Sequence, residues 1–138
     1  MIELTVEQWQ LLEGLTATVL PSDDAPGAVE AHVGVFLRRA FESGRWSARH
    51  ELLTSGLRTL ELLARSRGHR SFAACGPAER DEILARLQRL PHPQVRRFLA
   101  LIVEMTLTGF LCDPRHGGNH DGAGWAAVGW QPRDPFAR

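Results

Sequence analysis

The stretch "QVRRFLALIVEMTLTGFL", residues 94–111, decides the fold of this chain. Helical spacing places most of its apolar side chains on one stripe: Val95, Phe98, Leu99, Ile102, Met105 and Phe110. Further apolar side chains lie on the other faces: Leu101, Val103, Leu107 and Leu111. A helix that is apolar nearly all round is usually buried by its neighbours, so we expect this one to be the central helix of a bundle.

Capping and stop signals predict four further helices before it. Thr5, with Gln8 three residues later, matches a capping box, and Pro21 stops the helix that follows. Pro77 suits the first turn of a later helix, in which acidic residues come early and arginines late, as the helix dipole favours. The predicted helices cover about 5–20, 28–44, 47–68 and 77–90.

The remaining pattern excludes a sheet. No segment of useful length alternates apolar and polar residues as a half-buried strand does, and no internal repeat stands out. We therefore predict an all-α fold: one domain over residues 1–138, with a bundle of about five helices over 5–111. The segment 112–138, rich in Gly and Trp, is predicted to be an irregular tail.

Charge and hydropathy exclude several kinds of partner. Sixteen Arg and no Lys balance sixteen Asp and Glu, so no electrostatic footprint for nucleic acid or anionic lipid exists. No run of eighteen apolar residues is present, and direct membrane insertion is not expected. The first basic residue after Met1 is Arg38, so no export signal can be recognised and the sequence as it stands predicts a cytoplasmic protein.

The two cysteines form no known metal or haem motif. Cys75 and Cys112 stand far apart in the chain, and neither belongs to a C-x-x-C or C-x-x-C-H pattern. Each thiol is expected to be a small buried apolar side chain. A disulfide between them remains an alternative in an oxidising compartment.

The tail contains a false nucleotide-binding pattern within "DPRHGGNHDGAGWAAVGW", residues 113–130. Gly122, Gly124 and Ala127 match G-x-G-x-x-A, but that fingerprint needs a strand before it and an acidic residue about 20 positions later. Only fourteen residues follow Gly124, so we interpret the match as accidental.

The same stretch offers a possible metal site. Asp113, His116, His120 and Asp121 provide imidazole and carboxylate ligands within nine residues, and a small metal-dependent enzyme is one hypothesis. The competing interpretation is that Asp and Asn side chains bond the loop's own amides. The other histidines are expected to be solvated or satisfied: His32, His50, His69 and His92. No catalytic motif occurs, so we predict no catalytic residue in this chain.

Trp125 and Trp130 are the large side chains of the tail. Aromatic residues are abundant in cores and in interfaces alike. Either the two rings pack back on the bundle, or they dock on another protein.

Two segments resemble the small component (gamma, or subunit 3) of gluconate 2-dehydrogenase and related flavoprotein dehydrogenases: "ATVLPSDDAPGAVEAHVGVFL" (17–37) and "TLTGFLCDPRHGGNHDGAGWAAVGW" (106–130). The upstream pattern is met by Leu20, Pro21, Asp23, Pro26, Gly27, Ala28, Ala31 and Val33. The downstream pattern is met by Phe110, Asp113, Pro114, Gly117, Gly118, Asn119, Asp121, Gly124, Trp125, Val128, Gly129 and Trp130. His116 departs from it, because the family usually has an aromatic residue such as Tyr there.

The resemblance implies a non-catalytic subunit of a heteromeric complex. In such complexes a large flavoprotein of the glucose-methanol-choline (GMC) type oxidises a sugar, sugar acid or polyol with FAD, and a cytochrome c subunit with haem often takes the electrons. This chain would bind no cofactor and would serve the assembly, stability or maturation of the flavoprotein, or alternatively act as its export escort or chaperone. As the alternative to a cytoplasmic location, the chain would then be periplasmic or membrane-associated through this complex.

The resemblance also implies which residues bind the partner. The predicted partner-binding residues all lie at the end of the central helix or in the tail: Phe110, Asp113, Pro114, His116, Gly117, Gly118, Asn119, Asp121, Gly124, Trp125, Gly129 and Trp130.

Overall fold

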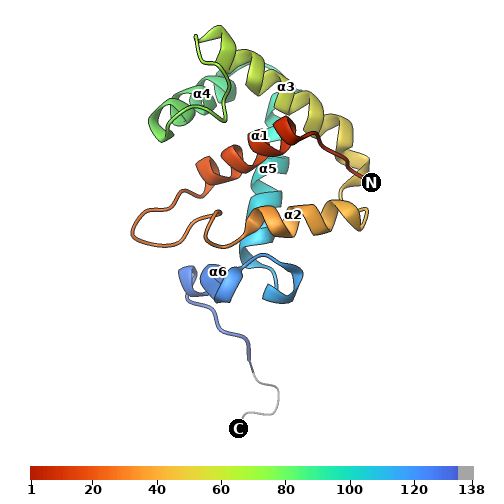
Figure 1. Cartoon of the computed structure of the whole chain (residues 1–138), viewed down its shortest axis with the longest axis vertical. Helices are drawn as coiled ribbons and strands as arrows, with labels where there is room; N and C mark the ends of the chain where they lie inside the picture. The colour runs from red at the N-terminus through yellow and green to blue at the C-terminus, as the bar shows by residue number, and fades with distance from the viewer. Residues whose placement is uncertain (134–138) are drawn as a thin grey trace.

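A computed structural model describes residues 1–133 of the chain; the last five residues of the predicted tail lie outside the described part. Within that part the fold is all-α, as predicted, with six α-helices and no strand (Figure 1). The helices are α1 (Val6–Val19), α2 (Val33–Glu42), α3 (His50–Ser66), α4 (Pro77–Arg89), α5 (Pro93–Leu111) and α6 (Ala123–Ala127). Three short 3₁₀ turns accompany them: Ser47–Arg49, Pro114–His116 and His120–Gly122.

Helix α5 is the centre of the bundle, as its sequence predicts. It runs along the long axis of the molecule and packs against each of the other five α-helices (Figure 1). Phe98, Ile102 and Met105 are all buried on its inner stripe. Gly56 of α3 lies directly against the Phe98 ring, where a Cβ atom would overlap the aromatic carbons. The two longest helices are therefore in close contact where the core is densest.

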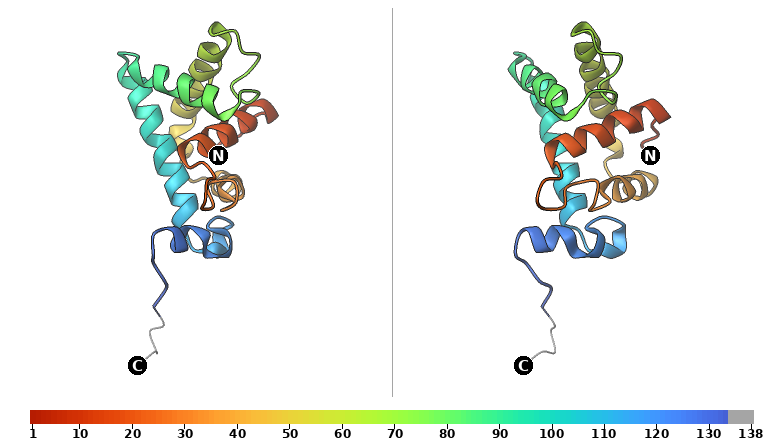
Figure 2. Two further views of the ribbon diagram at one scale, coloured as in Figure 1. Left: turned by 90° about the vertical axis from the view of Figure 1, so that its left-hand side faces the viewer. Right: turned by 60° about the vertical axis from the view of Figure 1, so that its left-hand side comes forward.

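One face of α5 is nevertheless not covered. In Figure 2 (left) α5 runs along one side of the molecule, with α1 and α2 to the other side of it. Val103, Leu107 and Leu111 are between 37% and 42% exposed, whereas Leu101 is buried. The bundle buries only part of an all-round apolar helix, and its outer face remains open.

The capping box predicted at the first helix is present. The Gln8 amide donates to Thr5 Oγ1 at 3.1 Å, and the Thr5 amide donates to Gln8 Oε1 at 2.8 Å. Two of the amides left free at a helix start are thereby satisfied reciprocally.

The second helix begins later than predicted, at Val33 and not near Ala28. The Ala28 amide donates to the Leu20 carbonyl at 2.9 Å, and Gly27 lies so close to Leu20 that a Cβ atom would overlap its oxygen. His32 then has a left-handed backbone, with φ 57°. Residues 27–32 are therefore a turn folded onto the end of α1, and a left-handed residue separates that turn from α2.

The predicted irregular tail contains more structure than expected. Two of the 3₁₀ turns and α6 lie in residues 113–127, and α6 packs across the end of α5 (Figure 2). Glycines and a left-handed Asn119 divide the segment into pieces of one turn or little more, which is why no helical period is visible in the sequence.

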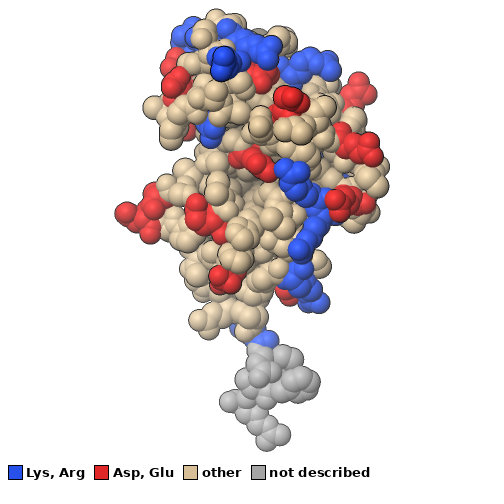
Figure 3. All heavy atoms as spheres, in the orientation of Figure 1, with Lys and Arg blue, Asp and Glu red and all other residues tan. Residues whose placement is uncertain are grey.

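The surface agrees with the balanced composition. Figure 3 shows acidic and basic side chains both distributed over the visible face. No helix among residues 1–133 combines the length and the apolarity that crossing a membrane requires. Both cysteines are free; Cys75 is buried as expected, whereas Cys112 is only partly buried.

Candidate functional site

The candidate site is the C-terminal loop, residues 112–130, which folds back across the end of α5 (Figures 1 and 2). Its central residue is Asn119, which is fully buried and has a left-handed backbone. Asn119 Nδ2 donates to the Cys112 carbonyl at 2.8 Å. Its Oδ1 accepts from the amides of Gly124 at 2.8 Å and Trp125 at 3.2 Å. One side chain thus connects the last turn of α5 to the first turn of α6.

The backbone of Asn119 adds to the same connection. Its amide donates to the Gly109 carbonyl at 2.9 Å, and its carbonyl accepts from the Gly122 amide at 2.9 Å. Carbonyls at a helix end have no partner within the helix and need one from outside. The loop supplies these partners, so it is a rigid continuation of α5.

Gly118 and Gly124 are required for the close approach of the loop to the helix. A Cβ atom on Gly118 would overlap the Gly109 carbonyl, and one on Gly124 would overlap the Phe110 carbonyl. Both glycines are buried, as is Phe110. The close packing of the loop on the helix end therefore requires glycine at both positions.

The sequence left open whether the two tryptophans pack on the bundle or remain available to another protein, and the two residues differ in this respect. Trp125 Nε1 donates to the Leu111 carbonyl at 2.9 Å, so this ring is fastened to the protein's own helix end. Trp130 packs edge-on against Trp125, with ring centroids 4.7 Å apart, yet remains 48% exposed. Gly129, with φ 70°, lets the chain turn so that the Trp130 amide reaches the Trp125 carbonyl at 2.9 Å.

An apolar strip adjoins the loop. It consists of Val103, Leu107 and Leu111 on the outer face of α5, spaced four residues apart, and of Trp130. Trp125 joins the helix to Trp130 through its hydrogen bond to Leu111 and its ring contact. Sequence reasoning assigned the helix positions to the core; their exposure emerges only from the packing.

The start of the loop is a tight turn at Asp113. Its Oδ1 accepts from the Arg115 amide at 3.0 Å, and its Oδ2 lies 3.0 Å from Arg115 Nη2. The hydrogen bond from the Arg115 amide, with that from its guanidinium, lowers the pKa of the Asp113 carboxyl. Pro114 opens the 3₁₀ turn, His116 is exposed at its end, and Gly117 follows with φ 99°.

A pair of stacked histidines connects the loop to the turn before α2. The rings of His32 and His120 lie 3.8 Å apart at an interplanar angle of 17°, and the His120 amide donates to the Ala31 carbonyl at 3.1 Å. The two segments that carry the sequence resemblance therefore meet in space. Sequence reasoning treated His32 as solvated or satisfied, and no local signal indicates the pairing across 88 residues.

The four metal-ligand candidates do not converge. Asp113 pairs with Arg115, and His120 Nε2 lies 3.3 Å from Asp121. Among residues 1–133 no three of Asp113, His116, His120 and Asp121 bring their ligand atoms together. Asp121 also bonds no loop amide, so of the side chains expected to tie the turns only Asp113 and Asn119 do so.

The glycine fingerprint is accidental in its geometry as well. Gly122, Gly124 and Ala127 lie on a 3₁₀ turn and on α6, and no strand precedes them in the described residues. The fold that such a fingerprint serves is a parallel sheet with helices on both faces. This loop therefore does not form a dinucleotide cradle.

Comparison with known families gives one finding. The family model described as "Gluconate 2-dehydrogenase subunit 3" matches residues 6–132, from the first residue of α1 to beyond the C-terminal loop. No curated protein and no solved structure matches the chain.

Proposed function

Since the chain belongs to the gluconate 2-dehydrogenase subunit 3 family, we propose that it is the non-catalytic small subunit of a heteromeric FAD-dependent dehydrogenase that oxidises a sugar, sugar acid or polyol. In this proposal it supports the assembly and stability of a large GMC-type flavoprotein subunit. In this proposal FAD belongs to that subunit, and the all-α fold of the described residues, which differs from the parallel-sheet fold that commonly holds a dinucleotide, supports that assignment. Where the complex includes a cytochrome c subunit, haem belongs there.

The observation that carries the proposal is the apolar strip beside a rigid loop. A helix that is apolar all round but covered on only part of its circumference has a face that water solvates poorly. Contiguous exposed apolar surface is typical of interaction sites, whereas single exposed apolar residues are common everywhere on proteins. The family name designates one subunit among several, so the expected occupant of this face is the large subunit.

The geometry suits an obligate contact. The Asn119 hydrogen bonds fix the loop before any partner arrives, so little conformational entropy is lost when it docks. Trp130 is an exposed aromatic anchor of the kind that dominates binding energy, and Leu107 adds apolar surface on α5. Permanent interfaces are mostly apolar and bury more than ~2,000 Å² in total.

The test is co-purification with the flavoprotein subunit through a tag on one chain. We expect the two chains to be recovered together, with full flavin loading only when both are present. Recovery of the tagged flavoprotein alone, fully loaded and active, would contradict the proposal.

A charge on the strip gives the sharper test of the surface. Leu107→Glu should weaken the complex by ~2 kcal/mol or more while the thermal stability of the isolated chain falls by much less, because the side chain is already 40% exposed in that chain. Leu62→Glu is the matched control, since Leu62 is an exposed leucine on α3, away from the strip. Equal loss of binding in the two variants would show that the strip is not the interface.

A further inference from the structure

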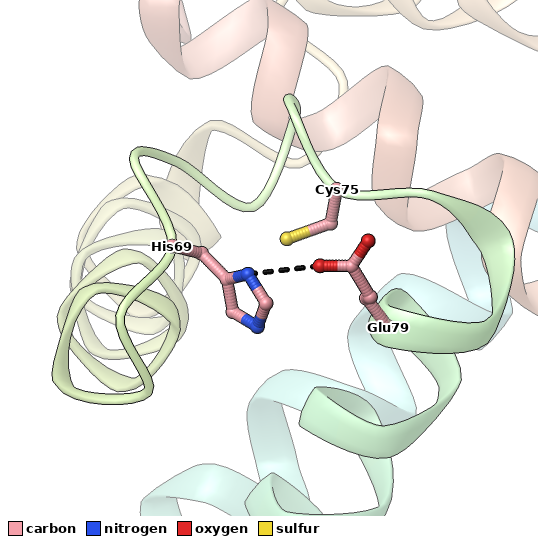
Figure 4. Close-up of side chains that lie close together, drawn as sticks. All are labelled: His69, Cys75 and Glu79. Atoms are coloured by element: carbon pink, nitrogen blue, oxygen red, sulfur yellow. Dashed lines mark ion pairs between the residues drawn. The ribbon is translucent and has the colours of Figure 1, made fainter.

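A second cluster lies where the connection between α3 and α4 meets the first turn of α4 (Figure 4). His69 Nδ1, Cys75 Sγ and a carboxylate oxygen of Glu79 all lie within 4.8 Å of one another. We propose that these three atoms bind one Zn²⁺ ion, with a water molecule as the fourth ligand. The proposal does not depend on the partner subunit.

The imidazole nitrogen faces two groups at once. His69 Nδ1 lies 2.9 Å from Glu79 Oε2, and Cys75 Sγ approaches the same side of the cluster (Figure 4). One Nδ1 proton serves one acceptor, here Glu79, while the Cys75 thiol donates to the Ser71 carbonyl at 3.3 Å, so without a metal the sulfur makes no bond to His69 or Glu79. A single cation between the three atoms would join all of them.

The distances suit tetrahedral zinc. With bonds of about 2.0–2.3 Å, ligand atoms in such a site lie about 3.3–3.8 Å apart. The nitrogen–oxygen distance of 2.9 Å has to open slightly, and the sulfur has to close from at most 4.8 Å. Both shifts are within the range that side-chain rotation can supply, so the proposal requires His69, Cys75 and Glu79 to adjust on binding.

The ligand types and their charges also suit zinc. Nitrogen, thiolate sulfur and carboxylate oxygen are all common zinc ligands, and the mixed set favours a borderline cation over Mg²⁺ or Ca²⁺. On binding, the thiol proton of Cys75 passes to solvent, and His69 coordinates as a neutral imidazole with its proton on Nε2. One thiolate and one carboxylate then balance the two positive charges of the ion.

The surrounding loop is held in place without a metal. Glu61 accepts from the Phe72 amide at 3.0 Å and from Ser71 Oγ at 3.2 Å, while Arg80 Nη2 donates to the Ala73 carbonyl at 2.7 Å. Phe72 is fully buried and anchors the loop in the core. The three ligands therefore belong to a preformed site, which lowers the entropic cost of binding.

The site is buried on one side and open on the other. Cys75 is buried, whereas the Glu79 side chain is about half exposed. Glu79 Oε1 accepts from the Gly76 amide at 3.4 Å, which orients the carboxylate so that Oε2 faces His69. Solvent thus reaches the position of the fourth ligand, and the ion would fasten the end of the loop to the first turn of α4.

The experiment is a Co²⁺ titration of the full-length chain, freed of metal by a chelator and of any affinity tag. We expect one equivalent to bind, with a thiolate-to-cobalt charge-transfer band and the visible bands of tetrahedral cobalt. Zn²⁺ should displace the cobalt and raise the melting temperature of the chain. A chain that gives no charge-transfer band and no thermal shift with Zn²⁺ would overturn the proposal.

Matched variants assign the ligands. Cys75→Ser should abolish the charge-transfer band, whereas Cys112→Ser, which changes the other free thiol, should leave it intact. Glu79→Gln should weaken Zn²⁺ binding at least about tenfold, because losing even a residue that only hydrogen-bonds a metal ligand lowers metal affinity about tenfold or more. Glutamine keeps a side-chain oxygen that can accept from the Gly76 amide, so we expect the variant to retain this contact at the start of α4 and to fold. A band that survives Cys75→Ser would overturn the assignment.

Discussion

Replacement of Asn119 by Ala should release the C-terminal loop from the end of α5. The side chain is fully buried and makes three hydrogen bonds, to the Cys112 carbonyl and to the amides of Gly124 and Trp125. Ala keeps none of them, and it leaves a carbonyl and two amides without their partner. Trp125 Nε1, which donates to the Leu111 carbonyl, is the other side-chain link between α5 and α6.

The magnitude follows from the bonds and from the backbone. Three hydrogen bonds at a net value of about 1 kcal/mol each give about 3 kcal/mol. The φ of 46° adds roughly 1 kcal/mol for Ala, because a Cβ atom is unfavourable in the left-handed region whereas Asn tolerates it. Asn119→Gly loses the three hydrogen bonds, but glycine adopts a positive φ without strain. It should therefore destabilise the loop by about 3 kcal/mol, and Asn119→Ala by about 4 kcal/mol.

Native-state amide exchange measures this loss where it occurs. The Gly124 amide, which Asn119 holds, should exchange at least ~100-fold faster in both variants, because each 1.4 kcal/mol is a factor of ten. The Leu60 amide, in the core of α3, serves as the internal control and should change far less. An increase of less than tenfold at Gly124 would refute the view that Asn119 holds the loop.

Three further predictions concern glycines and the acidic turn. Gly124→Ala should loosen the loop and weaken co-purification with the flavoprotein, because the added Cβ would overlap the Phe110 carbonyl at the end of α5. Gly122→Ala is the control: no atom lies within 4 Å of the added Cβ, so it should lower the folding stability by only about 1 kcal/mol and retain the partner. Gly56→Ala should destabilise the chain by about 1–3 kcal/mol in urea denaturation, since its Cβ would overlap the Phe98 ring, and a loss below about 0.5 kcal/mol would contradict this packing. The pKa of Asp113 is lowered in the folded chain, so its ionised carboxylate contributes to folding stability above the unfolded pKa, and this contribution is lost as the pH falls through the folded pKa. An NMR titration of the loop should therefore show the turn at Asp113 opening in acid, and Asp113→Asn should remove this pH dependence.

Local chemistry explains what the sequence predicted well. The box between Thr5 and Gln8, the proline at the start of α4 and the apolar stripe of α5 all involve residues within one or two helical turns of each other. Interactions of that range do not need the rest of the fold, so five helices and the all-α class follow from the sequence alone. The predicted start of α2 was wrong because the contact between Ala28 and Leu20 at the end of α1, and not local helix propensity, decides where α2 begins.

The site was predictable as a segment but not as a structure. The resemblance to the family indicated the loop, and Asp113 and Asn119 were expected to tie its turns. The sequence did not show that Asn119 bonds to both α5 and α6, that Trp125 is fastened to α5 while Trp130 is exposed, or that His32 stacks on His120. Each of these depends on the path that the chain takes after α5.

The sequence by itself therefore determined the all-α class, five of the helices, the capping box of α1 and the family of this protein. The tertiary structure decided which apolar side chains of α5 remain exposed and which distant polar groups meet, including His69, Cys75 and Glu79. The physical reason is range: helix formation is governed by neighbours a few residues away, whereas burial and side-chain convergence depend on how whole helices pack.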